Sequence, residues 1–169
     1  LTSFKPILNS SQKKLLRLLT HNCTSFVKVY LKYSMSAVIN FYNQHEPPYG
    51  VFSNFSAHPI YLGGAKWPTT EHYFQAMKFH PHSPKDVSEL RGMSSAGKAA
   101  GAGRDRSRPL HKKWESVKDT IMFDAVYAKF TQHKGLKALL LDTADAKIVE
   151  HTFKDNYWGD GGDGSGKNM

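Results

Sequence analysis

The sequence predicts one α+β domain that is mostly helical, with short strands and a single β-hairpin. At 169 residues the chain has the length of one domain with a substantial core. Its hydrophobic content of 40% and aromatic content of 12% are typical of a globular protein. Short β-branched and aromatic runs and longer stretches of helical apolar periodicity both occur, so the domain combines strands with helices.

Residues 1–34 differ from the rest of the chain in charge. They contain six basic residues and no acidic residue, so they hold +6 of the formal net charge of +9. The segment is basic, contains serine and has a short amphipathic run, as mitochondrial presequences do. Alternatively, Met35 is the true start and the preceding residues are an artefact. We expect residues 1–34 to be a leader, disordered or artefactual, and residues 35–169 to form the domain.

Composition narrows the classes of function. The charge left for residues 35–169 is only +3, which does not indicate a nucleic-acid-binding surface. Cys23 is the only cysteine, so we expect neither a disulfide framework nor a cysteine metal site, and we infer a reducing compartment. No apolar run approaches the roughly 18 residues of a membrane span, so no membrane partner is expected. We predict a cytoplasmic protein, or a mitochondrial one if the leader is a real presequence.

The first predicted elements are short strands. Residues 38–42 are β-branched and aromatic and are followed by a Pro-Pro-Tyr-Gly turn, which predicts a strand. Residues 50–55 are apolar but include Asn54, which is either a structural clamp or a ligand contact. Residues 59–67 predict a β-hairpin with Gly-Gly as its turn. The hairpin ends at Trp67, which is either a core residue or a stacking platform for a flat ligand.

A helix is predicted to begin directly after the hairpin, at Pro-Thr-Thr-Glu. A threonine at the N-cap can accept a hydrogen bond from a free backbone amide, and Glu71 in the first turn is favoured by the helix dipole. At about 100° per residue, Glu71, Gln75 and Lys78 share one helix face. This face is either an ordinary solvated surface or one wall of a polar site.

Helical patterns fill most of the remaining chain. The predicted helices span residues 84–91, 94–103, 111–132 and 136–141, and a strand follows at 147–151. Trp114 falls on the apolar stripe of the longest helix and is predicted to be a core residue. Arg104 and Arg108 belong to a cationic cluster that is either a solvated loop or a phosphate site.

Residues 155–168 form no regular pattern. They contain five glycines, two aromatic residues and three aspartates, which is typical of a loop that closely approaches a ligand, with a disordered terminus as the alternative. The near match to a phosphate-binding P-loop has Asn168 where that motif needs Ser or Thr, and the spacing of an EF-hand is absent.

Metal and acyl-transfer motifs are absent as well. His72, His80 and His82 are the candidate metal ligands near the predicted helix, but HExxH spacing does not occur. GxSxG is also missing, so a serine nucleophile is unsupported. We predict neither a catalytic metal nor a cofactor.

Several motifs in order resemble the YbiA-like (NADAR) family of N-glycosidases. They are YGVFSNF at 49–55, WPTTEHYFQAMKF at 67–79 and DNYWGDGG at 155–162, with shorter matches around Trp114, at Lys129-Phe130 and at 149–152. The resemblance covers the chain from about Ile39 onward. It implies an α+β fold with a single pocket and no metal. Family members continue past Gly-Lys-Asn with an apolar helix, so we expect a chain ending at Met169 to lack a core element on which stability and full activity depend.

The resemblance implies hydrolysis of an N-glycosidic bond. One branch of the family hydrolyses the ribosylamino bond of phosphorylated pyrimidine intermediates of riboflavin synthesis, and we predict this function, with ribose 5-phosphate and the base as products. Another branch removes ADP-ribose from guanine, and a non-catalytic module that binds ADP-ribose or a nucleotide is a further alternative. The expected partner is a small molecule, and nucleic acid enters only as an ADP-ribosylated substrate. The oligomeric state stays open.

Cleavage of an N-glycoside passes through an oxocarbenium-like state, which two carboxylates can serve. Glu71 is the predicted catalytic carboxylate, activating water or stabilising the cation. Asp155 would orient the ribose hydroxyls or assist the leaving group. The predicted substrate-binding residues comprise two stacking tryptophans, two amides that read polar edges, three cations for the 5′-phosphate and one glycine of the tail loop: Trp67, Trp158, Asn54, Gln75, Lys78, Arg104, Arg108 and Gly159.

Overall fold

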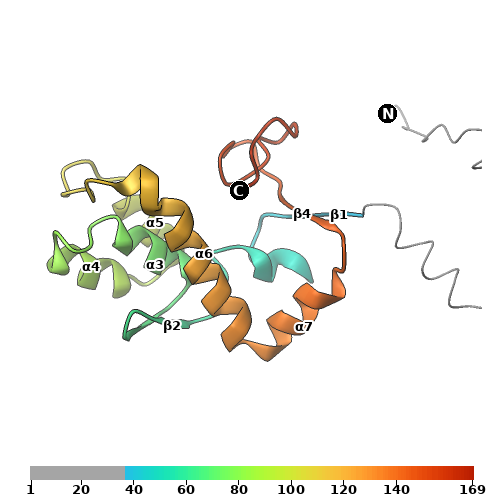
Figure 1. Cartoon of the computed structure of the whole chain (residues 1–169), viewed down its shortest axis with the longest axis horizontal. Helices are drawn as coiled ribbons and strands as arrows, with labels where there is room; N and C mark the ends of the chain where they lie inside the picture. Colours follow the sequence, from blue (N-terminus) through green and yellow to red (C-terminus); the bar gives the residue numbers. More distant parts are fainter. Residues whose placement is uncertain (1–36) are drawn as a thin grey trace, which may run out of the picture. The chain divides into compact units, whose positions relative to one another are not determined.

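The computed structural model describes residues 37–169, so the prediction of a leader at 1–34 lies outside the described residues. Figure 1 shows the described elements, which mix short strands with α-helices and confirm the predicted α+β class. In chain order they are β1 (Val38–Phe41), the 3₁₀ helix η1 (Tyr49–Phe52), β2 (Ile60–Leu62), β3 (Ala65–Trp67), α3 (Thr70–Met77), α4 (Pro84–Arg91), α5 (Ala96–Ala102), α6 (Trp114–Gln132), α7 (Lys134–Asp142) and β4 (Lys147–Glu150).

The strands form two separate pairs. β2 and β3 are the predicted hairpin, and its turn residues Gly63 and Gly64 have φ angles of 59° and 76°, a backbone conformation that glycine adopts without strain. β1 and β4 are parallel, with Phe41 opposite Glu150. The amide of His151 continues this pairing by donating to the carbonyl of Phe41 over 2.9 Å. The pairing therefore brings the start of the tail loop beside the beginning of the domain.

Helix α3 lies at the centre of the helical part and contacts α4, α5 and α6. It begins as predicted, because the Thr69 side chain caps it by accepting a hydrogen bond of 3.3 Å from the amide of His72. A cap of this kind contributes about 0.5–2 kcal/mol. The His72 ring is buried and bonds at its two nitrogens to Thr69 Oγ1 and the Met93 carbonyl, so this histidine serves the packing of α3.

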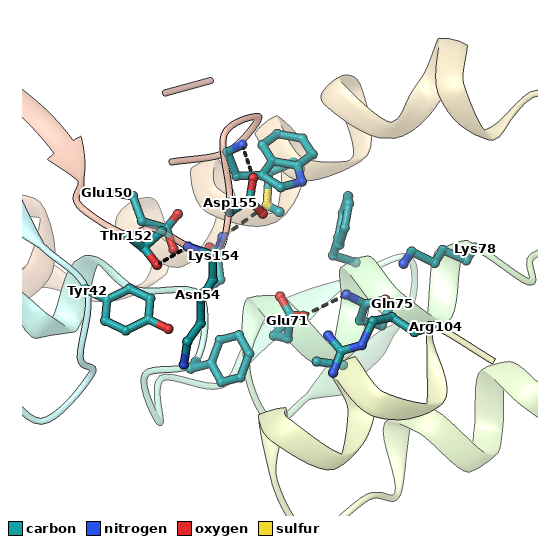
Figure 2. Close-up of a pocket in the computed structure, with 15 residues that line it drawn as sticks. Tyr42, Asn54, Glu71, Gln75, Lys78, Arg104, Glu150, Thr152, Lys154 and Asp155 are labelled. Carbon is teal, nitrogen blue, oxygen red and sulfur yellow. Dashed lines mark hydrogen bonds between the residues drawn. The ribbon is translucent and has the colours of Figure 1, made fainter. Parts of the chain in front are cut away.

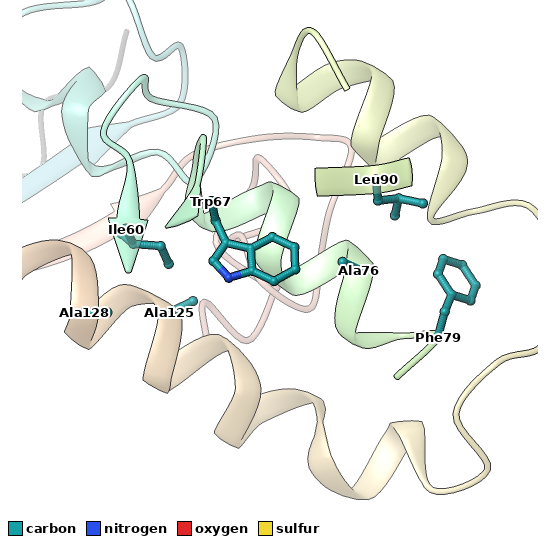
Figure 3. Packing of buried hydrophobic residues seen from close by; sticks show 7 residues of the cluster. All are labelled: Ile60, Trp67, Ala76, Phe79, Leu90, Ala125 and Ala128. Atoms are coloured by element: carbon teal, nitrogen blue, oxygen red, sulfur yellow. The ribbon is translucent and has the colours of Figure 1, made fainter. Parts of the chain in front are cut away.

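The main hydrophobic core lies between the hairpin, α3, α4 and α6 (Figure 3). Its buried members are Ile60, Trp67, Ala76, Phe79, Leu90, Ala125 and Ala128. Ala125 and Ala128 belong to α6, where small side chains allow the hairpin and α3 to approach the helix closely. One side of α3 is therefore buried in this core.

Helix α6 carries the predicted apolar stripe but begins at Trp114 rather than at His111, because residues 112–113 form a turn before it. Trp114 is buried, as predicted, and its ring lies 5.1 Å from that of Phe74. Lys129 of the same helix is also buried, with 1% of its surface exposed, although the apolar stripe gave no reason to expect this. No helix among residues 37–169 is long and apolar enough to cross a membrane.

The loop after β4 is held by its own side chains. The carboxylate of Asp160 accepts hydrogen bonds from the Thr152 amide (3.1 Å), the Gly162 amide (2.8 Å) and the His151 ring (2.7 Å). These bonds hold the pKa of Asp160 at about 2, with the His151 contact as the largest cause. Asn168 in turn bonds to the main chain of β4. The segment is irregular, as predicted, yet ordered by specific contacts.

Candidate active site

A cavity of about 380 Å³ lies between α3, the end of α5, α6 and the loop after β4. This volume is within the usual range for small-molecule sites. Seven residues predicted from the sequence line it: Asn54, Glu71, Gln75, Lys78, Arg104, Asp155 and Trp158. Figure 2 shows Glu71, Gln75, Lys78 and Arg104 on one side of the cavity and the residues of β4 and the following loop on the other. The polar face of α3 is therefore a cavity wall and not a solvated surface.

Glu71 occupies the first turn of α3 and is 6% exposed. Gln75, one turn later, donates a hydrogen bond of 2.7 Å from Nε2 to Glu71 Oε1. Burial raises the pKa of Glu71, while the Gln75 hydrogen bond and the charges of Lys78 and Arg104 oppose that rise. The result is a buried carboxyl group with one oxygen held by an amide.

Asn54 is both a clamp and a cavity residue. Thr70 Oγ1 lies 3.0 Å from both the carbonyl and the side-chain oxygen of Asn54, and the Glu71 amide donates to the same carbonyl over 3.1 Å. The side-chain amide contacts Met122 Sδ at 3.4 Å. The loop before the hairpin therefore positions the start of α3, so Asn54 is a structural clamp, and it also lines the cavity, where contact with a ligand stays a prediction.

The cations lie at the far end of the polar face of α3. Lys78 Nζ donates to the carbonyl of Gly103 over 3.1 Å and lies 5.7–5.8 Å from the ring centres of Phe74 and Trp114. Partial burial lowers the pKa of Lys78, and the charge of Glu71 opposes this shift. Arg104 follows α5 and is exposed at the cavity edge. This end of the cavity suits an anionic group of a ligand.

The tail loop contributes an acid and an aromatic ring. Asp155 Oδ1 accepts hydrogen bonds of 2.8 Å from the amides of Tyr157 and Trp158, which fixes the carboxylate in place. The Trp158 ring packs edge-on against Phe74 at 5.4 Å and is half-buried. Part of the indole surface therefore remains available to the cavity.

Sequence reasoning missed Glu150, at the end of β4, and Lys154, which both line the cavity. Burial is the largest cause that raises the pKa of Glu150 to about 7, and the charges of Asp155 and Glu71 add to it. The motif at 149–152 contained the signal, since it matched the family pattern around an acid at a strand end. Periodicity alone does not say which side of a four-residue strand faces a cavity.

The structure corrects the predicted stacking role of Trp67. The residue does not line the cavity but lies in the main core, 3% exposed, with its ring edge-on to Tyr73 at 5.2 Å. Its indole nitrogen donates to the Leu62 carbonyl over 3.0 Å, so its polar atom is satisfied within the hairpin. The packing of the hairpin onto α6 turns this ring away from the predicted stacking position.

Arg108 and Gly159 are also corrected. Arg108 is paired with Asp86, and with Glu89 over 2.8 Å, so its guanidinium ties the loop after α5 to α4 and is outside the cavity lining. Gly159 is buried, and a Cβ there would lie 2.8–2.9 Å from atoms of Glu150, Thr152 and Asp155. Its role is close packing beneath the loop.

Within residues 37–169, no group of three or more His, Cys, Asp or Glu side chains is arranged to hold a metal ion. The fold and site define a class: a small α+β domain with a cavity that is lined by carboxylates, an aromatic ring and cations. The chain belongs to the NADAR domain family, whose sequence model matches residues 40–169.

Individual relatives agree with this assignment. N-glycosidase YbiA of Escherichia coli is 57% identical over 131 residues, which are 78% of this chain and 80% of that protein. The NMR structure of E. coli YbiA matches with a TM-score of 0.72 over 79% of this chain and 77% of that chain. N-glycosidase Npun_R5314 of Nostoc punctiforme is 39% identical over 122 residues, covering 72% of this chain and 78% of that protein. The chloroplastic riboflavin biosynthesis protein PYRR of Zea mays is 36% identical over 144 residues, covering 78% of this chain but 23% of that protein. The family and fold expected from the motifs are confirmed.

Proposed function

We propose that this NADAR family member is an N-glycosidase that hydrolyses the ribosylamino bond of a phosphorylated pyrimidine intermediate of riboflavin synthesis. The products are ribose 5-phosphate and the free base. The observation that carries the proposal is the buried carboxylate of Glu71 in one cavity with Lys78 and Arg104. The names of the E. coli and Nostoc relatives support the reaction, and the name of the maize relative supports the substrate class.

Glu71 is the carboxylate that acts at the ribose C1′. As the C1′–N bond breaks, positive charge develops on the sugar, and a fixed carboxylate in a water-poor site stabilises it more strongly than one in bulk water. Water then adds to C1′ and loses a proton to Glu71. Gln75 holds Oε1 and leaves Oε2 for this work.

Asp155 and Trp158 bind the two halves of the substrate near the broken bond. Because two amides already fix Asp155 Oδ1, the carboxylate is a rigid acceptor suited to the ribose hydroxyls. Trp158 stacks on the pyrimidine, a contact worth about 1–3 kcal/mol per base. Asn54 and Gln75 supply the polar atoms that recognise edges of the base or sugar.

The 5′-phosphate binds at the cationic end of the cavity. Lys78 is a point charge that is already oriented by the Gly103 carbonyl, and Arg104 presents a planar donor set. Arg108 takes no part, because its guanidinium is paired with the acids of α4.

The test of this function is Glu71→Gln, with Glu115→Gln on the exposed start of α6 as the matched control. Base release is measured on a ribosylamino-pyrimidine 5-phosphate and, in parallel, on ADP-ribosylated guanosine. We expect parent and control to release the pyrimidine equally fast and Glu71→Gln to lose about a hundredfold or more in kcat. Equal rates for parent and Glu71→Gln would contradict the mechanism, and release from the guanosine alone would contradict the substrate.

A further inference from the structure

The backbone of Glu150 is fixed beside the cavity by hydrogen bonds at both its amide and its carbonyl. Its amide donates to Asn168 Oδ1 over 2.8 Å, and its carbonyl accepts from the Asp160 amide over 2.9 Å. Pairing of β4 with β1 places it opposite Phe41. The carboxyl group lines the same cavity as Glu71 and Asp155 (Figure 2), so its position does not depend on a mobile segment.

The charged groups around Glu150 come from several elements. Asp155 and Lys154 face it from the tail loop, Glu71 from α3, and Lys78 and Arg104 from the cationic end of the cavity. Tyr42, after β1, lines the same cavity, and Glu46 lines an adjoining cavity that Glu150 also reaches. Of these charged groups, the two that raise the pKa of Glu150 are the carboxylates Asp155 and Glu71.

Glu71 is buried and Glu150 is half-buried, and the groups that contact their carboxyls differ. Burial is the largest cause that raises the pKa of Glu71, but the hydrogen bond from Gln75 and the charges of Lys78 and Arg104 oppose this rise and favour the ionised form. In the part of the chain that the structure describes, no hydrogen bond is donated to the Glu150 carboxyl, and burial beside two acids favours its protonated form. A pair of carboxyl groups divided in this way is suited to base and acid roles.

We propose that Glu150 is the catalytic acid that protonates the leaving-group nitrogen, a step that rests on the proposed N-glycosidase function. The proton of the Glu150 carboxyl passes to the glycosidic nitrogen while the C1′–N electron pair leaves with that nitrogen. Water adds to C1′ and gives its proton to Glu71. The products are the neutral amine and the sugar hemiacetal. Proton exchange with solvent then restores ionised Glu71 and protonated Glu150.

This assignment divides the carboxyl groups of the cavity into three tasks. Glu150 donates a proton, Glu71 accepts one, and Asp155 stays an acceptor because its Oδ1 is already engaged by two amides. A pKa of about 7 for Glu150 is suited to a group that must hold a proton at neutral pH and release it in the transition state.

The experiment compares Glu150→Gln with Glu46→Gln, an exposed carboxylate at the adjoining cavity, on two substrates. One is the ribosylamino-pyrimidine 5-phosphate, and the other is p-nitrophenyl ribofuranoside 5-phosphate, whose leaving group needs no proton. We expect Glu150→Gln to lose about 10²–10⁴-fold in kcat on the ribosylamine, the usual effect of a general acid. Its kcat on the nitrophenyl compound should stay within about threefold of the parent, and Glu46→Gln should match the parent on both.

The pH profile gives a second readout. The parent should lose kcat/KM on the ribosylamine as pH rises through about 7, and this alkaline limb should be absent in Glu150→Gln. An equal loss on both substrates, or an unchanged profile in a variant that keeps parental kcat, would overturn the role of Glu150. A parent protein that cleaves neither compound would instead overturn the N-glycosidase function itself, and the inference with it.

Discussion

Lys129 Nζ donates a hydrogen bond of 2.8 Å to the carbonyl of Ser53, which links the last turn of α6 to the residue before Asn54. A second bond of 2.7 Å joins the ammonium to Ser56 Oγ. No carboxylate among residues 37–169 pairs with this lysine, and burial alone lowers its pKa to about 7. Since the Asn54 carbonyl accepts a hydrogen bond from the Glu71 amide, the buried lysine is two contacts away from the start of α3.

The buried lysine predicts a pH dependence of stability that Lys129→Met should remove. In the unfolded chain the lysine titrates near 10.5, and in the folded protein near 7. Between these values the unfolded chain binds more protons, so the free energy of unfolding should rise with pH. Urea unfolding from pH 7 to pH 10 should show this rise in the parent and a flatter profile in Lys129→Met.

Lys137→Met, on the exposed surface of α7, is the control for this substitution. Its lysine is solvated in both states, so the variant should keep the parental slope. An identical slope in Lys129→Met would mean that another group causes the dependence.

Gly103→Ala should impair catalysis without unfolding the protein. Gly103 has a φ of −67°, so alanine fits its backbone, but a Cβ would collide with the side-chain amide of Gln75. Gln75 must then move, and its hydrogen bond to Glu71 is displaced. We expect kcat to fall roughly ten- to a hundredfold, because small displacements of active-site groups reduce rates by about this factor. Steady-state kinetics and circular dichroism on the purified variant would test this.

Gly101→Ala is the matched control, two residues earlier in α5. Its Cβ would meet nothing within 4 Å, so only the helix propensity changes. The variant should keep parental kcat and gain about 0.5–1 kcal/mol of stability. Equal kcat in both alanine variants would show that Gln75 does not need its observed position.

Arg104→Ala and Arg108→Ala should have different effects although both remove an arginine from one loop. Arg104 lines the cavity, so its loss should raise KM for a 5′-phosphorylated substrate by roughly ten- to a hundredfold. This factor corresponds to the free energy of one hydrogen bond to a charged group. Arg108 is bonded to Asp86 and Glu89, so its loss should lower the melting temperature and leave KM near parental. Kinetics with thermal unfolding separates the two, and a raised KM only in Arg108→Ala would reverse the assignment.

The sequence was sufficient where local periodicity decides the structure. The helix that contains Glu71, Gln75 and Lys78 is fixed by its cap and by the 100° rotation per residue, and the three residues do line one cavity. The Gly-Gly hairpin and the strand at Val38–Phe41 depend equally on near neighbours. Such elements are predicted well because few distant contacts can override them.

The errors at Trp67, Arg108 and Glu150 concern contacts between distant segments. Whether Trp67 faces core or cavity depends on how the hairpin meets α6, and whether Arg108 is free depends on acids of α4 some twenty residues earlier. Glu150 reaches the cavity because β4 pairs with β1 from the opposite end of the domain. None of these pairings leaves a periodic trace in the sequence, so residue type alone assigned the tryptophan and the arginine to the site.

The three hydrogen bonds accepted by Asp160 have a kinetic consequence. They fold the loop bearing Asp155 and Trp158 into one shape before any ligand arrives, so little chain entropy is left to lose on association. Encounter with substrate should therefore follow simple bimolecular kinetics, with an observed rate that grows linearly with concentration. Asp160→Asn weakens the His151 contact. This variant should show an additional slow unimolecular phase, because its loop must reorder after the substrate binds.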